Sequence, residues 1–287
     1  MKKALAIIIS LATMIFILSS CDDNNPVVCD NVPAAPQGVY SVTGDNAVYI
    51  FWNGIYEKDV AGYTVWRSLE PNNNFVEIGH VDADSNPNLD LLIYEFDDNT
   101  ANNGVTYYYA VSAYDDAGQE SELSAENVFD TPRPDGQITL FDYQVDSTLS
   151  GYNFAAQATV NYDSPVADVY IDRVGGVFYL NVTDTLTDIQ DMGYTDSFDD
   201  ISYAPQNGWS ENGWAEIIVG HTYVIWTRDS HYAKMRVLSI NTNSITFRWA
   251  YQTDQDNPEL VSPSTIVIRP SHNPNYLNKN IISNNNK

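Results

Sequence analysis

The clearest indication of the fold of the first half is the stretch Gly104-Val105-Thr106-Tyr107-Tyr108-Tyr109-Ala110-Val111-Ser112-Ala113. A glycine opens it, and aromatic and β-branched residues then fill it, which predicts a β-strand. Further strand-like runs surround it, separated by turn-forming clusters, and this spacing is the signature of a β-sandwich or barrel. These runs cover residues 47–52, 63–67, 75–78, 92–96 and 126–131.

The same stretch resembles part of a fibronectin type III domain, through its Gly-x-Thr-Tyr-x-Tyr-x-Val-x-Ala pattern. A proline-led opening and a strand that carries Trp52 extend the resemblance over residues 33–132. The resemblance implies a sandwich in which Trp52 is buried and Tyr107 forms the tyrosine corner. Because the chain contains no Arg-Gly-Asp, integrin-type adhesion is not implied, and we expect this domain to act as a spacer.

The second half, residues 137–270, is also β-rich, and a proline-containing hinge at residues 131–136 separates it from the first. Residues 245–252 alternate strictly between apolar and polar, and Gly175-Gly176 indicates a hairpin turn. The sequence therefore predicts an all-β chain, with a second β-sandwich or β-rich domain after the first. The candidate strands are residues 138–145, 154–161, 167–171, 177–182, 215–219, 222–227, 232–240, 244–252 and 265–268.

Several of these runs resemble strands of HmuY-like surface lipoproteins, namely residues 167–172, 177–181, 220–227, 229–237 and 245–252. Some members of that family hold haem iron between two histidines, and many others have no known ligand. No residue of this chain is matched to the haem histidines, so haem binding does not follow from the resemblance.

The amino terminus has the parts of a secretory signal over residues 1–20: two lysines, a short apolar run and small residues. The following Leu-Ser-Ser-Cys, ending at Cys21, resembles a bacterial lipobox, which implies a lipid on Cys21 and a tether over residues 21–32. We therefore expect an envelope lipoprotein anchored at the outer membrane or cell surface of a bacterium. The alternative is an ordinary cleaved signal with an incidental cysteine.

Composition narrows the possible partners. The chain has 13 basic and 38 acidic residues, and the signal removes two lysines without removing an acid. Nucleic acid and anionic lipid surfaces are poor partners for such a charge. If Cys21 is lipidated, Cys29 has no partner for an intramolecular disulfide. The Asn-rich tail, residues 271–287, is predicted to be disordered.

A ligand site is predicted in the long, irregular stretch at residues 184–214. It contains Trp209 and Trp214 in a glycine-rich segment, with Tyr203 nearby. Such rings are able to stack on sugars or on another flat ligand. The alternative is that both tryptophans fold down over the open end of the sandwich.

Two groups of residues are candidate metal sites, and the alternative for each is an ordinary polar turn. His221 and His231 are metal or haem ligands if the strands bring them together. Asp82, Asp84 and Asn86 follow an alternate-residue pattern that supplies oxygen ligands for calcium, although a solvated polar loop is the better interpretation. The cofactor therefore stays open, with haem and calcium as the candidates.

The sequence thus predicts a lipid-anchored binding protein rather than an enzyme, with its ligand or partner held by the second domain. One alternative is a structural or assembly component of an envelope complex. A weaker alternative is an extracellular hydrolase that uses paired acids such as Asp199 and Asp200. The common metalloprotease, redox, hydrolase and nucleotide-binding motifs do not occur in the chain.

Overall fold

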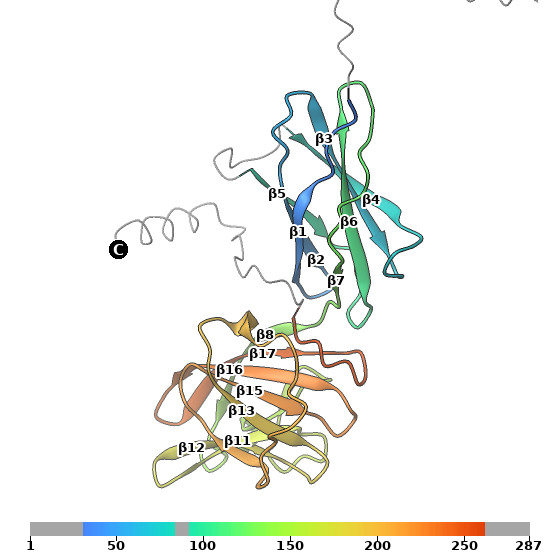
Figure 1. The fold of residues 1–287 in the computed structure, drawn as a ribbon. Coiled ribbons are helices and arrows are strands. Elements are labelled where there is room, and N and C mark those ends of the chain that lie inside the picture. The colour runs from blue at the N-terminus through green and yellow to red at the C-terminus, as the bar shows by residue number, and fades with distance from the viewer. Residues whose placement is uncertain (1–30, 84–91, 262–287) are drawn as a thin grey trace, which may run out of the picture. The chain divides into compact units, whose positions relative to one another are not determined.

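The computed structural model describes residues 31–83 and 92–261, and strands dominate both ranges (Figure 1). The strands form four antiparallel sheets, and no sheet mixes strands β1–β7 with strands β8–β17. The all-β prediction is therefore confirmed. Within the described residues, no helix has the length and hydropathy needed to cross a membrane.

The first sandwich is built from one three-stranded and one four-stranded sheet. The three-stranded sheet has the order β1 (Gln37–Thr43), β2 (Val48–Asn53), β5 (Ile93–Asp98). The four-stranded sheet has the order β4 (Val76–Asp82), β3 (Val60–Ser68), β6 (Tyr107–Asp115), β7 (Val128–Asp130).

A tryptophan and a tyrosine corner define the interior of the first sandwich. Trp52 is fully buried and packs against the rings of Tyr63 and Tyr94. The hydroxyl of Tyr107 accepts a hydrogen bond from the backbone N–H of Asn102 at 3.2 Å. These are the two roles that the resemblance implied, and the first sandwich is fibronectin type III-like in strand arrangement and corner.

The second sandwich is built from two five-stranded sheets. One sheet, here called the platform sheet, has the order β10 (Ala158–Val160), β9 (Gly151–Asn153), β11 (Val169–Val174), β12 (Val177–Val182), β14 (Trp214–Glu216). The other, here called the opposite sheet, has the order β13 (Asp188–Tyr194), β15 (His221–Trp226), β16 (Tyr232–Ile240), β17 (Ser244–Tyr251), β8 (Asp135–Phe141).

The core of the second sandwich lies between these sheets. The predicted alternation in β17 is confirmed, since Ile245, Phe247, Trp249 and Tyr251 all belong to the buried cluster. Both facing sheets contribute large side chains to this cluster, which forms a continuous apolar layer between them. Burial of this layer stabilises the sandwich by about 25 cal/mol for each Å² of apolar surface removed from water. The platform sheet supplies Tyr152, Val169, Ile171, Phe178, Leu180 and Ala215.

The turn predicted at Gly175-Gly176 is confirmed. β11 and β12 pair up to Val174 and Val177, which leaves the two glycines as the whole loop. Their φ angles are +62° and +93°, and a two-residue loop with both φ positive matches the twist of the strands that it joins.

Parts of the predicted secondary structure of the second half were wrong in detail. Residues 154–161 are not one strand, because a turn that includes Gln157, with φ +53°, separates β9 from β10. Residues 184–214 are not irregular throughout, because they contain β13. Only Ile189 of β13 is buried in the core, and the pairing with β15 shifts register after Asp191. The sequence of β13 therefore lacks the apolar alternation that would have predicted a strand. The predicted strand at residues 265–268 lies outside the described residues.

The second sandwich contains its own tyrosine corner. Tyr223 accepts a hydrogen bond from the backbone N–H of Ile218 at 3.0 Å, and its hydroxyl donates to the carbonyl of Glu216 at 2.7 Å. Gly220 and Gly104 stand three residues before the two corner tyrosines, with φ of +85° and +75°. The Gly-x-Thr-Tyr pattern therefore occurs twice with the same local geometry.

Candidate ligand-binding face

The outer surface of the platform sheet carries a set of aromatic residues. Strand residues alternate between the two faces of a sheet, so the neighbours of core residues point outward. Val169, Ile171, Phe178, Leu180 and Ala215 belong to the core. The residues between or beside them on the same strands are therefore on the outer face: Tyr170, Asp172, Tyr179, Asn181, Trp214 and Glu216.

The strand register places these six side chains in two rows that cross β11, β12 and β14. One row is Tyr170, Asn181 and Trp214, and the other is Asp172, Tyr179 and Glu216. Directly opposite residues in antiparallel strands lie about 5 Å apart. The six positions therefore form a compact grid on one face.

At the β14 end of the grid, Trp214 meets Tyr179. Their ring centroids lie 5.1 Å apart and the ring planes are at 88°, an edge-to-face contact. Trp214 is 44% exposed although its partner ring covers part of it. Edge strand β14 thus presents a large, fixed aromatic ring to solvent.

At the other end of the grid, Tyr170 meets two tyrosines from neighbouring loops. Its ring centroid lies 5.8 Å from that of Tyr162 and 6.4 Å from that of Tyr143. Partial burial of the phenol is the main cause that raises the pKa of Tyr170, and the nearby negative charge of Asp172 raises it further. The phenol therefore stays neutral and keeps its hydroxyl proton at physiological pH.

Gly151 allows this second cluster to form. It pairs with Tyr170 in the sheet, in the same row. A Cβ on Gly151 would lie 3.1 Å from the carbonyl oxygen of Asn161 and 3.3 Å from the Cα of Tyr162. The absent side chain lets the segment with Tyr162 cross close over β9.

Polar side chains fill the rest of the grid: Asn181 and Asp172 lie between the two aromatic clusters, and Glu216 lies beside Tyr179 on edge strand β14. Asn181 donates from Nδ2 to Oδ1 of Asp172 at 2.9 Å, which fixes the orientation of both groups. Glu216 on β14 is exposed. The strip formed by Asp172, Asn181 and Glu216 is therefore rich in hydrogen-bond acceptors.

The basic side chains of the described second sandwich lie elsewhere. Arg173 packs over Phe178, and Arg228 binds a cluster of loops. On the opposite sheet, Lys234 donates to the carbonyl of Phe198, and Arg236 donates to the carbonyl of Thr195. Arg248 on the same sheet donates to the carboxylate of Asp135. Arg133 donates to the carbonyl of Leu260. The outer face of the platform sheet thus carries negative charge without a compensating cation.

The structure separates the three aromatic residues that the sequence grouped. Trp214 lies on the platform sheet, whereas Trp209 packs 6.0 Å from Trp226 of the opposite sheet. Tyr203 forms an isolated bridge with Glu259 and is 44% exposed. Trp209 and Trp214 do not form one platform.

The two candidate metal-binding histidines are also apart. His221 begins β15 and His231 follows the hairpin at the other end of that strand, so about 20 Å separates them. His221 Nδ1 contacts Asp191 at 2.9 Å, and His231 Nδ1 lies 3.4 Å from Asp229. No group of three or more potential metal ligands occurs within residues 31–83 and 92–261.

Other predicted sites lie partly or wholly outside the described residues. Asp82 ends β4, but Asp84 and Asn86 of the candidate calcium loop are not described. The same holds for Cys21, for the signal over residues 1–20 and for the tail over residues 271–287. These remain predictions.

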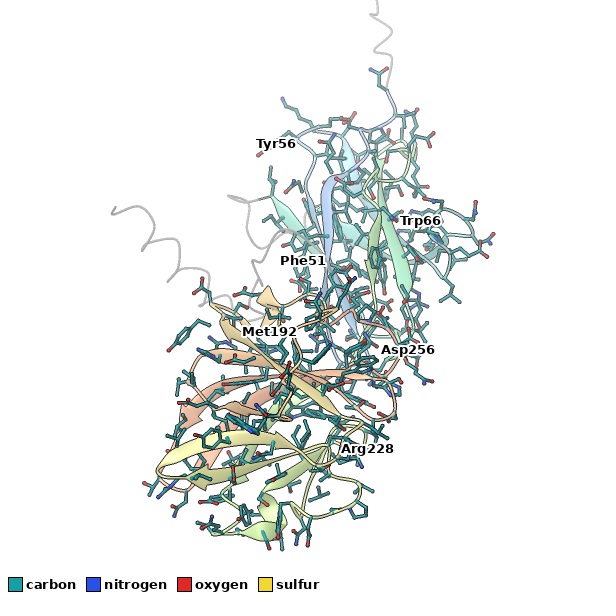
Figure 2. All side chains as sticks on the ribbon, turned by 60° about the horizontal axis from the view of Figure 1, so that its bottom comes forward. Phe51, Tyr56, Trp66, Met192, Arg228 and Asp256 are labelled. Carbon is teal, nitrogen blue, oxygen red and sulfur yellow. The ribbon has the colours of Figure 1, made fainter. Side chains whose placement is uncertain are left out.

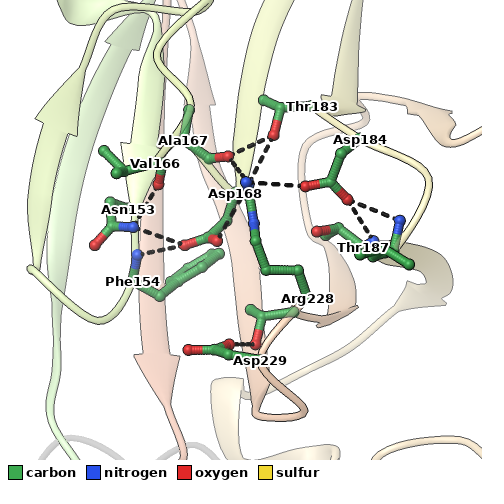
Figure 3. Close-up of polar contacts among 12 residues, drawn as sticks. Asn153, Phe154, Val166, Ala167, Asp168, Thr183, Asp184, Thr187, Arg228 and Asp229 are labelled. Atoms are coloured by element: carbon green, nitrogen blue, oxygen red, sulfur yellow. Dashed lines mark hydrogen bonds and ion pairs between the residues drawn. The ribbon is translucent and has the colours of Figure 1, made fainter.

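A group of carboxylates in the second sandwich lies close to Arg228 (Figure 3). The guanidinium lies 3.0 Å from Asp184 and 3.8 Å from Asp168, and it donates to the carbonyls of Pro165 and Ala167. Asp168 also accepts from the backbone N–H of Phe154. Burial raises the pKa of Asp168 to about 6.

These contacts indicate a structural role for the Arg228 cluster. Asp184 accepts hydrogen bonds from the backbone N–H groups of Leu186 and Thr187, both at 2.8 Å. The acids named as a possible hydrolytic pair are similarly engaged, since Asp200 caps a short turn and Asp199 lies 4.0 Å from Lys234. The aromatic face is therefore the better candidate for ligand binding.

Sequence reasoning missed four members of this face, namely Tyr143, Tyr162, Tyr170 and Tyr179. The signal for two of them was present, because Tyr170 and Tyr179 alternate with core residues in adjacent predicted strands. Tyr143 and Tyr162 lie in loops, and only the folded arrangement brings them to Tyr170.

Comparison with known proteins gives distant similarities. No family model matches the chain. The chain is 24% identical over 166 residues to amylopullulanases of Thermoanaerobacterium saccharolyticum and Thermoanaerobacterium thermosulfurigenes. This similarity covers 58% of the chain, but only 11% and 8% of the two relatives. The chain thus spans about a tenth of their length.

Three solved structures are among those that match parts of the chain. An Fn3-like protein from Clostridium thermocellum is 26% identical, with 34% of this chain and 92% of that chain covered and a TM-score of 0.28. A β-1,2-glucanase from Parabacteroides distasonis is 24% identical, and the match covers 36% of this chain and 13% of the glucanase, with a TM-score of 0.28. The FN1-FN3 domains of chicken CNTN1 are 14% identical, and the match covers 71% of this chain and 63% of the CNTN1 chain, with a TM-score of 0.32.

These TM-scores are low. The fibronectin type III-like assignment of the first sandwich therefore rests on its strand arrangement and tyrosine corner. The resemblance of the second half to HmuY-like lipoproteins stays a prediction.

Proposed function

We propose that this chain is a lipid-anchored, extracytoplasmic protein that binds carbohydrate on the outer face of the platform sheet. The observation that carries the proposal is the aromatic and acceptor-rich grid around Trp214, Tyr179 and Tyr170. The first sandwich serves as a spacer between the anchor and this face.

Carbohydrate suits the chemistry of the grid. One face of a sugar ring presents C–H groups, which pack well on the electron-rich face of an aromatic ring. Sugar hydroxyls donate hydrogen bonds, and Asp172, Asn181 and Glu216 supply acceptors. The similarity to two amylopullulanases supports a carbohydrate context.

The anchor is proposed from the sequence. Cys21 follows Leu-Ser-Ser and an apolar run, and a lipoprotein with several acyl chains is held stably at a membrane. Labelling growing cells with a tagged fatty acid tests this step. We expect label on the wild-type protein and none on the Cys21→Ala variant, and an unlabelled wild-type protein would contradict the anchor.

Carbohydrate binding is tested with the full chain carrying Cys21→Ala as a soluble background. The protein is applied to an array of oligosaccharides together with Trp214→Ala and a control, Tyr56→Ala. Tyr56 is 88% exposed in the first sandwich and is labelled in Figure 2. We expect binding that Trp214→Ala removes and Tyr56→Ala retains. Absence of binding to every oligosaccharide would contradict the proposed function.

A further inference from the structure

We propose that the ligand is a neutral, linear glycan that lies across the strands, with separate sugar residues at the two aromatic clusters. This inference rests on the proposed function and specifies its ligand. One cluster is the Trp214–Tyr179 pair, and the other is the group of Tyr143, Tyr162 and Tyr170.

The spacing of the clusters requires an extended ligand. Tyr170 and Trp214 occupy the same row of the grid on β11 and β14, with β12 between them. Two inter-strand spacings separate their backbones, about 10 Å. That distance is larger than one sugar ring. A chain of several linked sugars is therefore needed to contact both clusters at once.

The polar groups between the clusters select for hydroxyl donors. Asn181 Nδ2 is occupied by Asp172, which orients the amide so that its Oδ1 accepts hydrogen bonds. The second carboxylate oxygen of Asp172 is a further acceptor, and Glu216 contributes an exposed carboxylate in the same row as Asp172. The acceptors of Asn181 and Asp172 lie between the clusters and match the hydroxyl groups of a sugar between the two stacked ones.

The charge of the face selects for a neutral glycan. Asp172 and Glu216 are acidic. The basic side chains of the described second sandwich contact rings, carbonyls or carboxylates outside the grid. The whole chain carries a formal net charge of −25. Uronate-containing or sulfated glycans would be repelled at close range without a cation to offset that repulsion. The same argument disfavours haem, which carries two propionate groups.

The test is a calorimetric titration of the full chain with Cys21→Ala. The probes are cello-oligosaccharides and malto-oligosaccharides of two and six residues, together with oligogalacturonate of six residues. We expect one or both neutral hexamers to bind at least tenfold more tightly than their dimers. Oligogalacturonate should bind at least tenfold more weakly than that hexamer.

Substitutions at the two clusters then assign the sugar residues. Trp214→Ala and Tyr170→Ala should each weaken hexamer binding about tenfold, the effect of losing one stacked ring. Tyr56→Ala, which lies in the first sandwich, should bind within about twofold of the parent. Asp172→Asn should narrow the difference between neutral and acidic hexamers, because it removes a charge and keeps an acceptor.

Several results would overturn the inference and leave the proposed function intact. Equal affinities for dimer and hexamer, or tighter binding of oligogalacturonate, would exclude an extended neutral ligand. Loss of hexamer binding in Trp214→Ala but not in Tyr170→Ala would restrict the site to one cluster. If no sugar binds and Trp214→Ala instead abolishes haem binding or self-association, both the inference and the proposed function fail.

Discussion

The ring of Trp214 stands edge-on to the ring of Tyr179, with centroids 5.1 Å apart and planes at 88°. Trp214 belongs to edge strand β14 and Tyr179 to its neighbour β12, so the contact joins two strands across the outer face of the platform sheet. The pair fixes the orientation of a tryptophan that is 44% exposed. A fixed and exposed aromatic ring is well suited to stacking on a ligand.

Replacing Trp214 by alanine should weaken carbohydrate binding about tenfold or more, with little effect on folding. The side chain is half exposed on an edge strand, and we expect the free energy of unfolding to fall by about 1 kcal/mol or less. Urea denaturation followed by circular dichroism measures this. A loss of several kcal/mol would show that the ring is a core element rather than a binding element.

Replacing Tyr223 by phenylalanine should destabilise the second sandwich. The hydroxyl accepts from the backbone N–H of Ile218 and donates to the carbonyl of Glu216, and both groups lose their partner in the variant. We expect a loss of roughly 1–3 kcal/mol in the free energy of unfolding.

The Tyr107→Phe variant is the matched comparison in the first sandwich, where the hydroxyl accepts from Asn102. Tyr56→Phe is the exposed control and should have no effect. Denaturation curves of the three variants would refute the structural role of the second corner if Tyr223→Phe behaved like the exposed control.

The buried carboxyl group of Asp168 should make stability depend on pH. Its pKa is raised by burial from an ordinary value of 3.8 to about 6. Between pH 4 and pH 6 the folded protein therefore holds a proton that the unfolded chain has lost. The contribution of Asp168 to stability is full below about pH 4 and declines as the pH rises through 6.

The Asp168→Asn variant isolates this effect. Asparagine keeps an oxygen that accepts from the backbone N–H of Phe154, but it does not ionise. Relative to wild type, the variant should gain about 2 kcal/mol between pH 4 and pH 7, measured by urea denaturation at several pH values. A difference between the two proteins that does not change with pH would contradict the assigned pKa.

Replacing Arg228 by methionine should destabilise the end of the second sandwich that Figure 3 shows. The variant leaves Asp168 without its cation and removes hydrogen bonds to the carbonyls of Pro165 and Ala167. We expect a loss of roughly 2–3 kcal/mol at pH 7. The loss should be smaller at pH 4, where Asp168 is protonated in the folded protein and carries no charge for Arg228 to offset.

Arg173→Met is a suitable control, because Arg173 is only partly buried, donates a hydrogen bond to the carbonyl of Thr242 and packs over the ring of Phe178. Equal losses for the two arginine variants in thermal denaturation would argue against a special role for the Arg228 cluster.

Much of the fold was predictable because it depends on local patterns. The alternation of β17, the glycine pair between β11 and β12, and the motif that ends in Tyr107 each specify their structure within a few residues. β13 was not predictable in this way, because only Ile189 of that edge strand is buried in the core.

The binding face was only partly predictable, because the chain changes sheets within the predicted site. Ser210 donates its backbone N–H to Ile189 of the opposite sheet, and Gly213 accepts from the backbone N–H of Val182 of the platform sheet. Trp209 and Trp214 are therefore close in sequence but belong to different sheets. No pattern in the sequence shows where such a crossing takes place.

Carbohydrate binding on the platform sheet is tested by titrating the full chain with a neutral hexasaccharide that it binds, and by comparing Trp214→Ala with Trp209→Phe. Trp209 packs on Trp226 of the opposite sheet, and phenylalanine keeps an aromatic ring there. We predict that Trp214→Ala lowers the affinity about tenfold or more and that Trp209→Phe leaves it unchanged. Retained affinity in Trp214→Ala, with loss in Trp209→Phe, would place the ligand on the opposite sheet and contradict the account.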